Sequence, residues 1–225
     1  MTTPLLIWAT LCVYVLVRKV YLRYNHPLLN VVVLSSAAVI VLLLSLDLSF
    51  KDYVPAKDVM TFLLGPATVG LAVPLYRNRH LLRVYALPIL ASVCLGAMTA
   101  MLSAGFIASY AGLPRDIVMS IMPKGVSIPF AVEIARMYGG EPPLAVAFVV
   151  ATGTLGSLIG ASFLTKTGIV NPVARGLSLG TVSHAQGTAA ALMEGQEQGS
   201  MAGLAMILAG IFTALFAPVA AMLLG

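Results

Sequence analysis

Long apolar stretches with almost no charge constrain the fold of this chain more than any other feature. Leu28–Leu46 contains no charged residue, and Val84–Leu113 and Gly199–Gly225 are uncharged over greater lengths. About 20 apolar residues in a helix span the hydrocarbon core of a bilayer. The 225 residues are 60% hydrophobic and 9% charged, whereas a soluble domain carries about 25% charged residues. We therefore predict an all-α polytopic membrane protein.

Three polar segments, broken by glycine and proline, interrupt the apolar stretches at residues 64–70, 122–129 and 180–188. Each break leaves backbone N–H and C=O groups without helical partners, and lipid cannot satisfy them. Such segments are tolerated only where they are buried in protein or line a water-filled cavity. We therefore predict discontinuous (broken) helices whose breaks form a ligand site.

The positions of the basic residues indicate how the first spans are oriented. Three basic residues follow the apolar stretch 4–17, and three more follow the stretch 60–76: Arg18, Lys19, Arg23, Arg77, Arg79 and Arg83. Cytoplasmic loops carry an excess of Lys and Arg. The N-terminus is therefore predicted to lie outside.

The segment 117–138 allows two topologies. It contains two prolines, Lys124 and Glu133, and would be a poor lipid-facing helix. If it crosses the membrane, Lys166 and Arg175 fall outside, against the positive-inside rule; if it dips in and returns, they fall inside. The remaining predicted spans are Pro142–Leu164, Gly199–Leu224 and, with a polar centre, Val173–Met193. Seven or eight membrane segments result.

Short similarities between the breaks indicate an internal repeat within a single membrane domain, residues 1–225. Thr68-Val69-Gly70-Leu71-Ala72 is similar to Gly125-Val126-Ser127-Ile128-Pro129. The repeat halves would be residues 1–112 and 113–225, in either an inverted or a parallel sense. Repeats with discontinuous helices at matching positions are the best sequence indication of a transporter site.

The breaks combine features that suit a carboxylate. Half-helix N-termini present free N–H groups and a partial positive charge, hydroxyl and amide groups can hydrogen-bond oxygens, and Lys124 is the one cation within a break. The candidate substrate-binding residues are Pro66, Thr68, Lys124, Ser127, Ser183, His184, Gln186, Gly187 and Thr188.

Three ionisable residues each have two interpretations. Lys124 either serves as counter-charge within the site or extends its ammonium to the membrane interface. Glu133 and His184 are candidates for binding a coupling ion. Glu133 can instead pair with Arg136 at i+3, and His184 can instead be a hydrogen-bonded structural histidine.

Other functional classes lack support in the sequence. The net charge of +5 comes from basic residues in loops beside apolar stretches, not from a nucleic-acid-binding face. Ser183 beside His184 forms no nucleophile elbow, and no set of His, Cys and carboxylate residues has zinc-ligand spacing. We therefore expect no enzyme activity, metal or cofactor.

The broken segments resemble the LrgB/CidB family. Residues 66–76, P-A-T-V-G-L-A-V-P-L-Y, are similar to the family's P-A-x-V-A-L-A-x-P-L-Y, and residues 123–129, P-K-G-V-S-I-P, are similar to P-K-S-V-T-T-P. Residues 174–176 and 183–189 resemble the family's A-R-G and S-H-x-x-G-T-A blocks. The chain departs from the pattern at Gly125 and Ile128, where relatives often carry hydroxyl residues.

The resemblance implies two functions from different classes. One is a secondary transporter of small monocarboxylates such as glycolate, glycerate or pyruvate, working by alternating access. The other is a holin/antiholin-like regulator of murein hydrolase activity and cell lysis. It also implies a multi-pass protein of the bacterial cytoplasmic (inner) membrane, a homo-oligomer, and a small membrane subunit of the LrgA/CidA type as partner. Polar breaks inside the membrane favour the carrier, because a lysis regulator that acts by oligomerisation does not need them.

Overall fold

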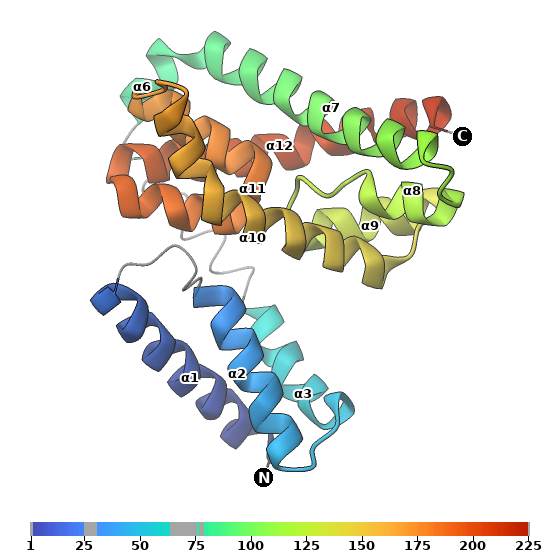
Figure 1. The fold of residues 1–225 in the computed structure, drawn as a ribbon. Coiled ribbons are helices and arrows are strands. Elements are labelled where there is room, and N and C mark those ends of the chain that lie inside the picture. Colours follow the sequence, from blue (N-terminus) through green and yellow to red (C-terminus); the bar gives the residue numbers. More distant parts are fainter. Residues whose placement is uncertain (1, 25–30, 64–75, 77–78, 225) are drawn as a thin grey trace. The chain divides into compact units, whose positions relative to one another are not determined.

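The structure is a computed structural model that describes residues 2–24, 31–63, 76 and 79–224. The regular elements in these residues are helices (Figure 1), which confirms the predicted all-α fold. The chain divides into two compact units, residues 1–72 and 73–225. The break that contains Pro66 and Thr68 lies outside the described residues.

The first unit contains three helices: α1 (Thr2–Tyr24), α2 (Val31–Ser45) and α3 (Phe50–Phe62). Each contributes one side chain to a buried apolar contact formed by Leu6, Leu43 and Ala56. The hydroxyls of Thr10 and Tyr53 lie 3.0 Å apart and link α1 to α3.

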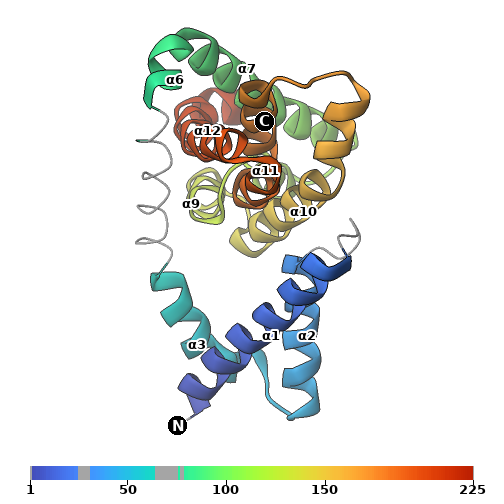
Figure 2. The same ribbon diagram turned by 90° about the vertical axis from the view of Figure 1, so that its left-hand side faces the viewer.

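The second unit is built around three long apolar helices. Their bounds are α7 (Ala86–Tyr110), α10 (Pro142–Lys166) and α12 (Gln196–Leu223). With α1, they are the described helices that are long and apolar enough to cross a membrane. Figure 2 looks nearly along α12, which packs against α7 on one side and α9 (Ile128–Tyr138) on another. The short helix α6 (Arg79–Val84) precedes α7.

A helical hairpin joins α7 to α10. We call it hairpin 1; it consists of α8 (Arg115–Ile121), a turn over residues 122–127, and α9. The N–H of Glu141 donates to Oγ of Ser120 at 2.7 Å. Residues 21 positions apart in a continuous helix would be about 31 Å apart, so the chain has folded back. Segment 117–138 therefore folds back on itself, as the second of the two predicted topologies requires.

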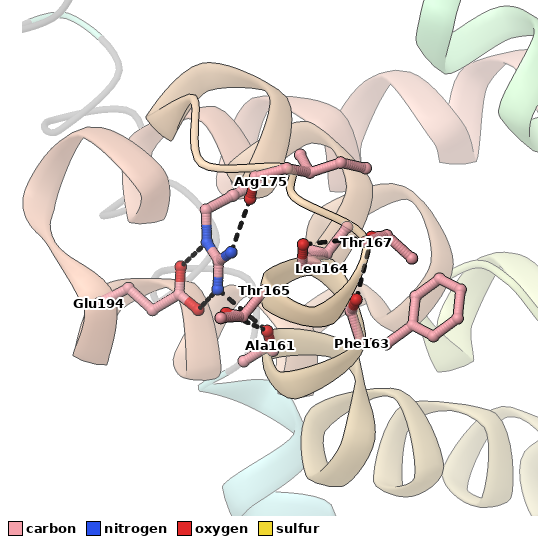
Figure 3. A network of polar contacts seen from close by, with 8 residues as sticks. Ala161, Phe163, Leu164, Thr165, Thr167, Arg175 and Glu194 are labelled. Atoms are coloured by element: carbon pink, nitrogen blue, oxygen red, sulfur yellow. Dashed lines mark hydrogen bonds and ion pairs between the residues drawn. The ribbon is translucent and has the colours of Figure 1, made fainter.

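A second hairpin, hairpin 2, joins α10 to α12 and is formed by α11 (Pro172–Glu194). The helix is interrupted at His184, whose φ of 41° and ψ of −125° are not helical. Arg175 near its start and Glu194 at its end form an ion pair of 2.6 Å (Figure 3). In a straight helix these residues would be about 28 Å apart. The prediction that Val173–Met193 spans the membrane is therefore wrong: a segment of the right length and polarity turns back at its polar centre.

The two hairpins lie at opposite ends of α10. Hairpin 1 precedes α10 and hairpin 2 follows it, and Figure 1 shows α8 and α9 at one end of the unit and α11 at the other. Both tips reach α10 near Val149: Val126 of hairpin 1 belongs to the same buried cluster as Val149, and Nε2 of His184 in hairpin 2 lies 3.0 Å from the carbonyl oxygen of that residue. Lys166 and Arg175 consequently lie at the end of the unit where α7 begins.

Candidate functional site

The tip of hairpin 2 is held by hydrogen bonds from its own polar side chains. Nε2 of His184 lies 3.0 Å from the carbonyl oxygen of Val149 in α10; because a carbonyl only accepts, this nitrogen carries the proton. Oγ1 of Thr188 donates to the carbonyl oxygen of His184 at 2.9 Å. A positive φ is strained for a histidine, and these two bonds hold the residue in that conformation.

Three glycines of α10 make room for this tip. A Cβ atom on Gly153 would lie 2.5 Å from Cε1 of His184, one on Gly156 would overlap Oγ of Ser183, and one on Gly160 would lie 2.7 Å from Leu179. Because glycine has no side chain, these positions of α10 let the first half of α11 and its tip approach closely. We call Gly153, Gly156 and Gly160 the glycine face of α10.

The other predicted residues of hairpin 2 also support its tip. Oε1 of Gln186 accepts a hydrogen bond of 3.2 Å from Oγ1 of Thr154, and Gly187 packs against the carbonyl oxygen of Leu179 in the first half of α11. Ser183, His184, Gln186, Gly187 and Thr188 are thus brought together, as the sequence predicts. The hydrogen bonds of His184, Gln186 and Thr188 are made to the hairpin itself and to α10, and Thr188 also lies beside Gly203 of α12.

The tip of hairpin 1 has fewer internal contacts. Ser127 occupies the N-cap position of α9, and its side chain makes no capping hydrogen bond. Lys124 is half-buried, and no ion pair joins it to another residue in the described part of the chain. A cation in a membrane protein is expensive without a counter-charge. The turn therefore offers a positive charge and an open helix N-terminus to a ligand.

The two tips meet. A Cβ atom on Gly125 of hairpin 1 would lie 3.8 Å from the carbonyl oxygen of Thr181 in hairpin 2 and 3.7 Å from Cβ of Ala100 in α7. A narrow space lies at this junction and is closed even to a water molecule in this conformation. It is lined by residues from α7, both hairpins and α12: Ala97, Ala100, Met101, Met122, Gly125, Thr181 and Thr213.

A groove of about 450 Å³ approaches this junction between α7 and the first half of α11. It begins beside Tyr85 and Asn171, at the end of the unit where α7 starts, and reaches Gly96 and Thr181. A Cβ on Gly96 would lie 3.1 Å from Cγ2 of Thr181. Thr181 therefore borders both the groove and the closed space.

Glu133 does not lie at the tips. It forms an ion pair of 3.0 Å with Arg136 in α9, and both side chains are about 60% exposed. The pairing is the i,i+3 helix contact that the sequence allows.

Sequence reasoning missed the two hydroxyls that line the closed space. Thr181 lies within the predicted break 180–188, so the sequence indicated that its segment belongs to the site. Thr181 itself was not among the predicted binding residues. Thr213 lies within a continuous apolar stretch, Ile211-Phe212-Thr213-Ala214-Leu215. Only the folded chain brings it to the hairpin tips.

The fold and the junction define the class of protein: a polytopic membrane protein with two hairpins that enter from opposite ends and meet near the middle of its spans. The comparisons with known proteins then give the family. Residues 10–223 match the LrgB-like family, and the chain belongs to it.

Curated relatives cover nearly the whole chain. The uncharacterized protein YxaC of Bacillus subtilis is 33% identical over 95% of this chain and 93% of its own length. The holin-like protein CidB of Staphylococcus epidermidis is 31% identical, and that of Staphylococcus aureus 29%, each over 96% of this chain and 94% of its own length. No solved structure matches the chain.

Proposed function

We propose that this protein is a secondary carrier of small monocarboxylates that works by alternating access. The observation that carries the proposal is the meeting of two hairpin tips near the middle of α7, α10 and α12. Because the hairpins have their bases at opposite ends of α10, each can open a route from the central site to one side. Discontinuous helices that meet at the midplane are typical of secondary transporters.

The charge at the junction supports an anionic substrate. Lys124 stands next to Gly125, which lines the closed space, and no carboxylate lines that space. The unpaired lysine and the uncapped start of α9 both favour a negative charge. The space itself is narrow and is lined by alanine, methionine, glycine and threonine residues, which favours a short acid over a large one.

The orientation follows from the positive-inside rule. Arg79, Arg83, Lys166 and Arg175 are associated with the same end of the second unit, where α7 starts and α10 ends. We assign this end to the cytoplasm, so hairpin 2 enters from the cytoplasm and hairpin 1 from outside. We further propose that the N-terminus lies outside and that the protein resides in the bacterial inner membrane.

Uptake into proteoliposomes tests the proposal. The purified protein should accumulate labelled glycolate, pyruvate or lactate with saturation. Lys124→Ala should raise KM by about tenfold or more, as expected for loss of a hydrogen bond to a charged group, and Lys124→Arg should retain part of the affinity. Equal uptake by the Lys124→Ala variant would remove this residue from the site.

The names of the staphylococcal relatives favour a second candidate, a holin-like function in cell lysis. It is distinguished by the same vesicles: a holin-like protein would release trapped ions and show no saturable uptake of any short acid. A homo-oligomer and a small LrgA/CidA-type subunit remain proposals, to be tested by purifying the protein with and without such a subunit and measuring mass and uptake.

A further inference from the structure

We propose that the groove between α7 and the first half of α11 holds one acyl chain of an anionic phospholipid, whose phosphate lies beside Arg83 and Lys166 at the outer end of the groove. The outer end is the one lined by Tyr85 and Asn171. This inference goes beyond the proposed transport of acids, because it concerns a lipid partner of the second unit and its tests measure no transport.

The groove follows two helices over the depth of one leaflet. On α7 it is lined at every fourth position, by Pro88, Ser92 and Gly96, and along α11 it extends over residues 171–182. Residues four apart lie on the same face of a helix. From Tyr85 to Gly96 the groove is about 17 Å long, at 1.5 Å per residue. Half of the hydrocarbon core of a bilayer is about 15 Å thick, so the groove has the length of a lipid chain in one leaflet.

The volume of the groove also matches a single hydrocarbon chain. About 450 Å³ spread over about 17 Å gives a mean cross-section of about 27 Å². A helix of another protein, about 10 Å in diameter, would fill about 1,300 Å³ over the same length. A helix is therefore too wide to enter the groove, whereas an extended acyl chain, only one CH₂ group wide, fits it.

The walls of the groove favour an apolar occupant. Within the described residues no charged side chain lines it, and its walls are mainly apolar. Two of its polar side chains already have partners in their own helices: Oγ of Ser92 donates to the carbonyl oxygen of Ile89 at 3.1 Å, and Oδ1 of Asn171 accepts from the N–H of Ala174 at 3.0 Å. An empty groove would forfeit van der Waals contacts along its walls, and a chain of the surrounding lipid restores them.

Basic residues lie near the outer end of the groove. Arg83 comes two positions before Tyr85, and Lys166 ends α10, five positions before Asn171. Within the described residues, neither forms an ion pair. Basic residues beside a membrane attract anionic headgroups, and tyrosine is typical of the headgroup level. The outer end therefore favours an anionic headgroup over a zwitterionic one.

The carboxylates at this end of the second unit do not cancel the positive charge. Glu194 is paired with Arg175, and Glu197 lies in the first turn of α12. Neither of the two lines the groove. Among the described residues at this end, Arg83, Lys166 and a further arginine of α6 outnumber Glu197. The charges are thus complementary to a phosphate.

A chain in the groove would contact α7 and the first half of α11 at the same time. The inner end of the groove lies at Gly96 and Thr181, where hairpin 2 meets α7. The lipid should therefore hold this half of hairpin 2 against α7. A ligand that binds the folded protein raises its melting temperature by mass action.

The first experiment compares lipids added to the purified, delipidated protein in detergent. Phosphatidylglycerol should raise the melting temperature at concentrations at least about tenfold lower than phosphatidylcholine with the same acyl chains. Native mass spectrometry should show phosphatidylglycerol retained on the protein. Glycerol phosphate carries the charge without a chain and should have no effect. Equal effects of the two lipids, or an equal effect of glycerol phosphate, would overturn the proposal.

Two pairs of variants test the chain and the headgroup separately. Ser92→Trp fills the groove and should abolish the shift caused by phosphatidylglycerol. Ser103→Trp is the matched control, because Ser103 is exposed on α7 outside the groove and, like Ser92, donates to the carbonyl oxygen three residues earlier. Arg83→Gln should lower the preference for phosphatidylglycerol about fivefold, whereas Arg136→Gln in α9 should not change it. A Ser92→Trp or Arg83→Gln variant that responds like its control would contradict the site.

A labelling measurement tests the groove even where Ser92→Trp does not fold. Ser92→Cys, made in a Cys12→Ala, Cys94→Ala background, should react with a thiol reagent in detergent, and phosphatidylglycerol should slow the reaction more than phosphatidylcholine does. Ser103→Cys in the same background is the control and should be slowed equally by both lipids. A Ser92→Cys thiol that is unreactive without lipid would show that protein fills the groove, and equal slowing by both lipids would show no anionic selectivity; either result overturns the proposal.

Discussion

The two hairpins of the second unit share a topology but differ in what holds them closed. At the base of hairpin 2, Arg175 binds Glu194 through two hydrogen bonds of 2.6 and 2.7 Å. The same guanidinium donates to the carbonyl oxygens of Ile169 and Ala161 (Figure 3). At the base of hairpin 1, the N–H of Glu141 donates to Oγ of Ser120.

The tips of the two hairpins also differ in what holds them. His184 of hairpin 2 is strained, yet it is bonded to Val149 and accepts a bond from Thr188. In hairpin 1, Ser127 does not cap α9, and Lys124 has no ion-pair partner in the part of the chain that the structure describes. Local opening takes least free energy where there are fewest such contacts. We therefore expect hairpin 1 to open more readily than hairpin 2.

The largest effect should come from the contact between hairpin 2 and the glycine face of α10. Gly156→Val would force a side chain into the position of Oγ of Ser183 and should destabilise the protein by about 3 kcal/mol or more. Ala151→Val, at an exposed position of the same helix, is the control and should have little effect. The measurement is the melting temperature in detergent. Equal melting of the two variants would show that hairpin 2 does not pack against this face.

A smaller effect is expected at the base of hairpin 2. The side chains of Arg175 and Glu194 are only 11% and 19% exposed, and breaking a buried pair leaves an uncompensated charge. Glu194→Gln should therefore cost about 3 kcal/mol at most. Glu133→Gln breaks the exposed pair in hairpin 1 and should cost less than about 0.5 kcal/mol. Denaturant unfolding compares the two variants, and similar losses would contradict the contrast between the hairpins.

Composition alone was enough to predict the spans of the second unit. α7, α10 and α12 coincide closely with predicted apolar stretches, because lipid requires a continuous apolar helix and leaves few alternatives. The two prolines and Lys124 indicated that segment 117–138 can return to the side from which it enters. The predicted repeat halves, 1–112 and 113–225, stay a prediction.

The turn in hairpin 2 could not be predicted in this way. Val173–Met193 has the length of a span, and the ion pair that shows it to be a hairpin joins residues 19 positions apart. The site was likewise only half predictable. Its breaks are visible as glycine, proline and polar residues, whereas Thr213 reaches the site through the packing of α12, which leaves no local pattern in the sequence.

An effect smaller than that of Glu194→Gln should come from the base of hairpin 1. Ser120→Ala removes both the acceptor of the Glu141 N–H and the donor to the carbonyl oxygen of Asp116, and losing these bonds should cost about 1–2 kcal/mol. Because the bond to Glu141 closes the hairpin, amide hydrogen exchange should speed up in residues 122–127 and remain slow in residues 180–188. The control is Ser103→Ala: Oγ of Ser103 donates at 3.3 Å to a carbonyl of its own helix, α7, outside both hairpins. Faster exchange in hairpin 2 instead would reverse the order in which we expect the hairpins to open.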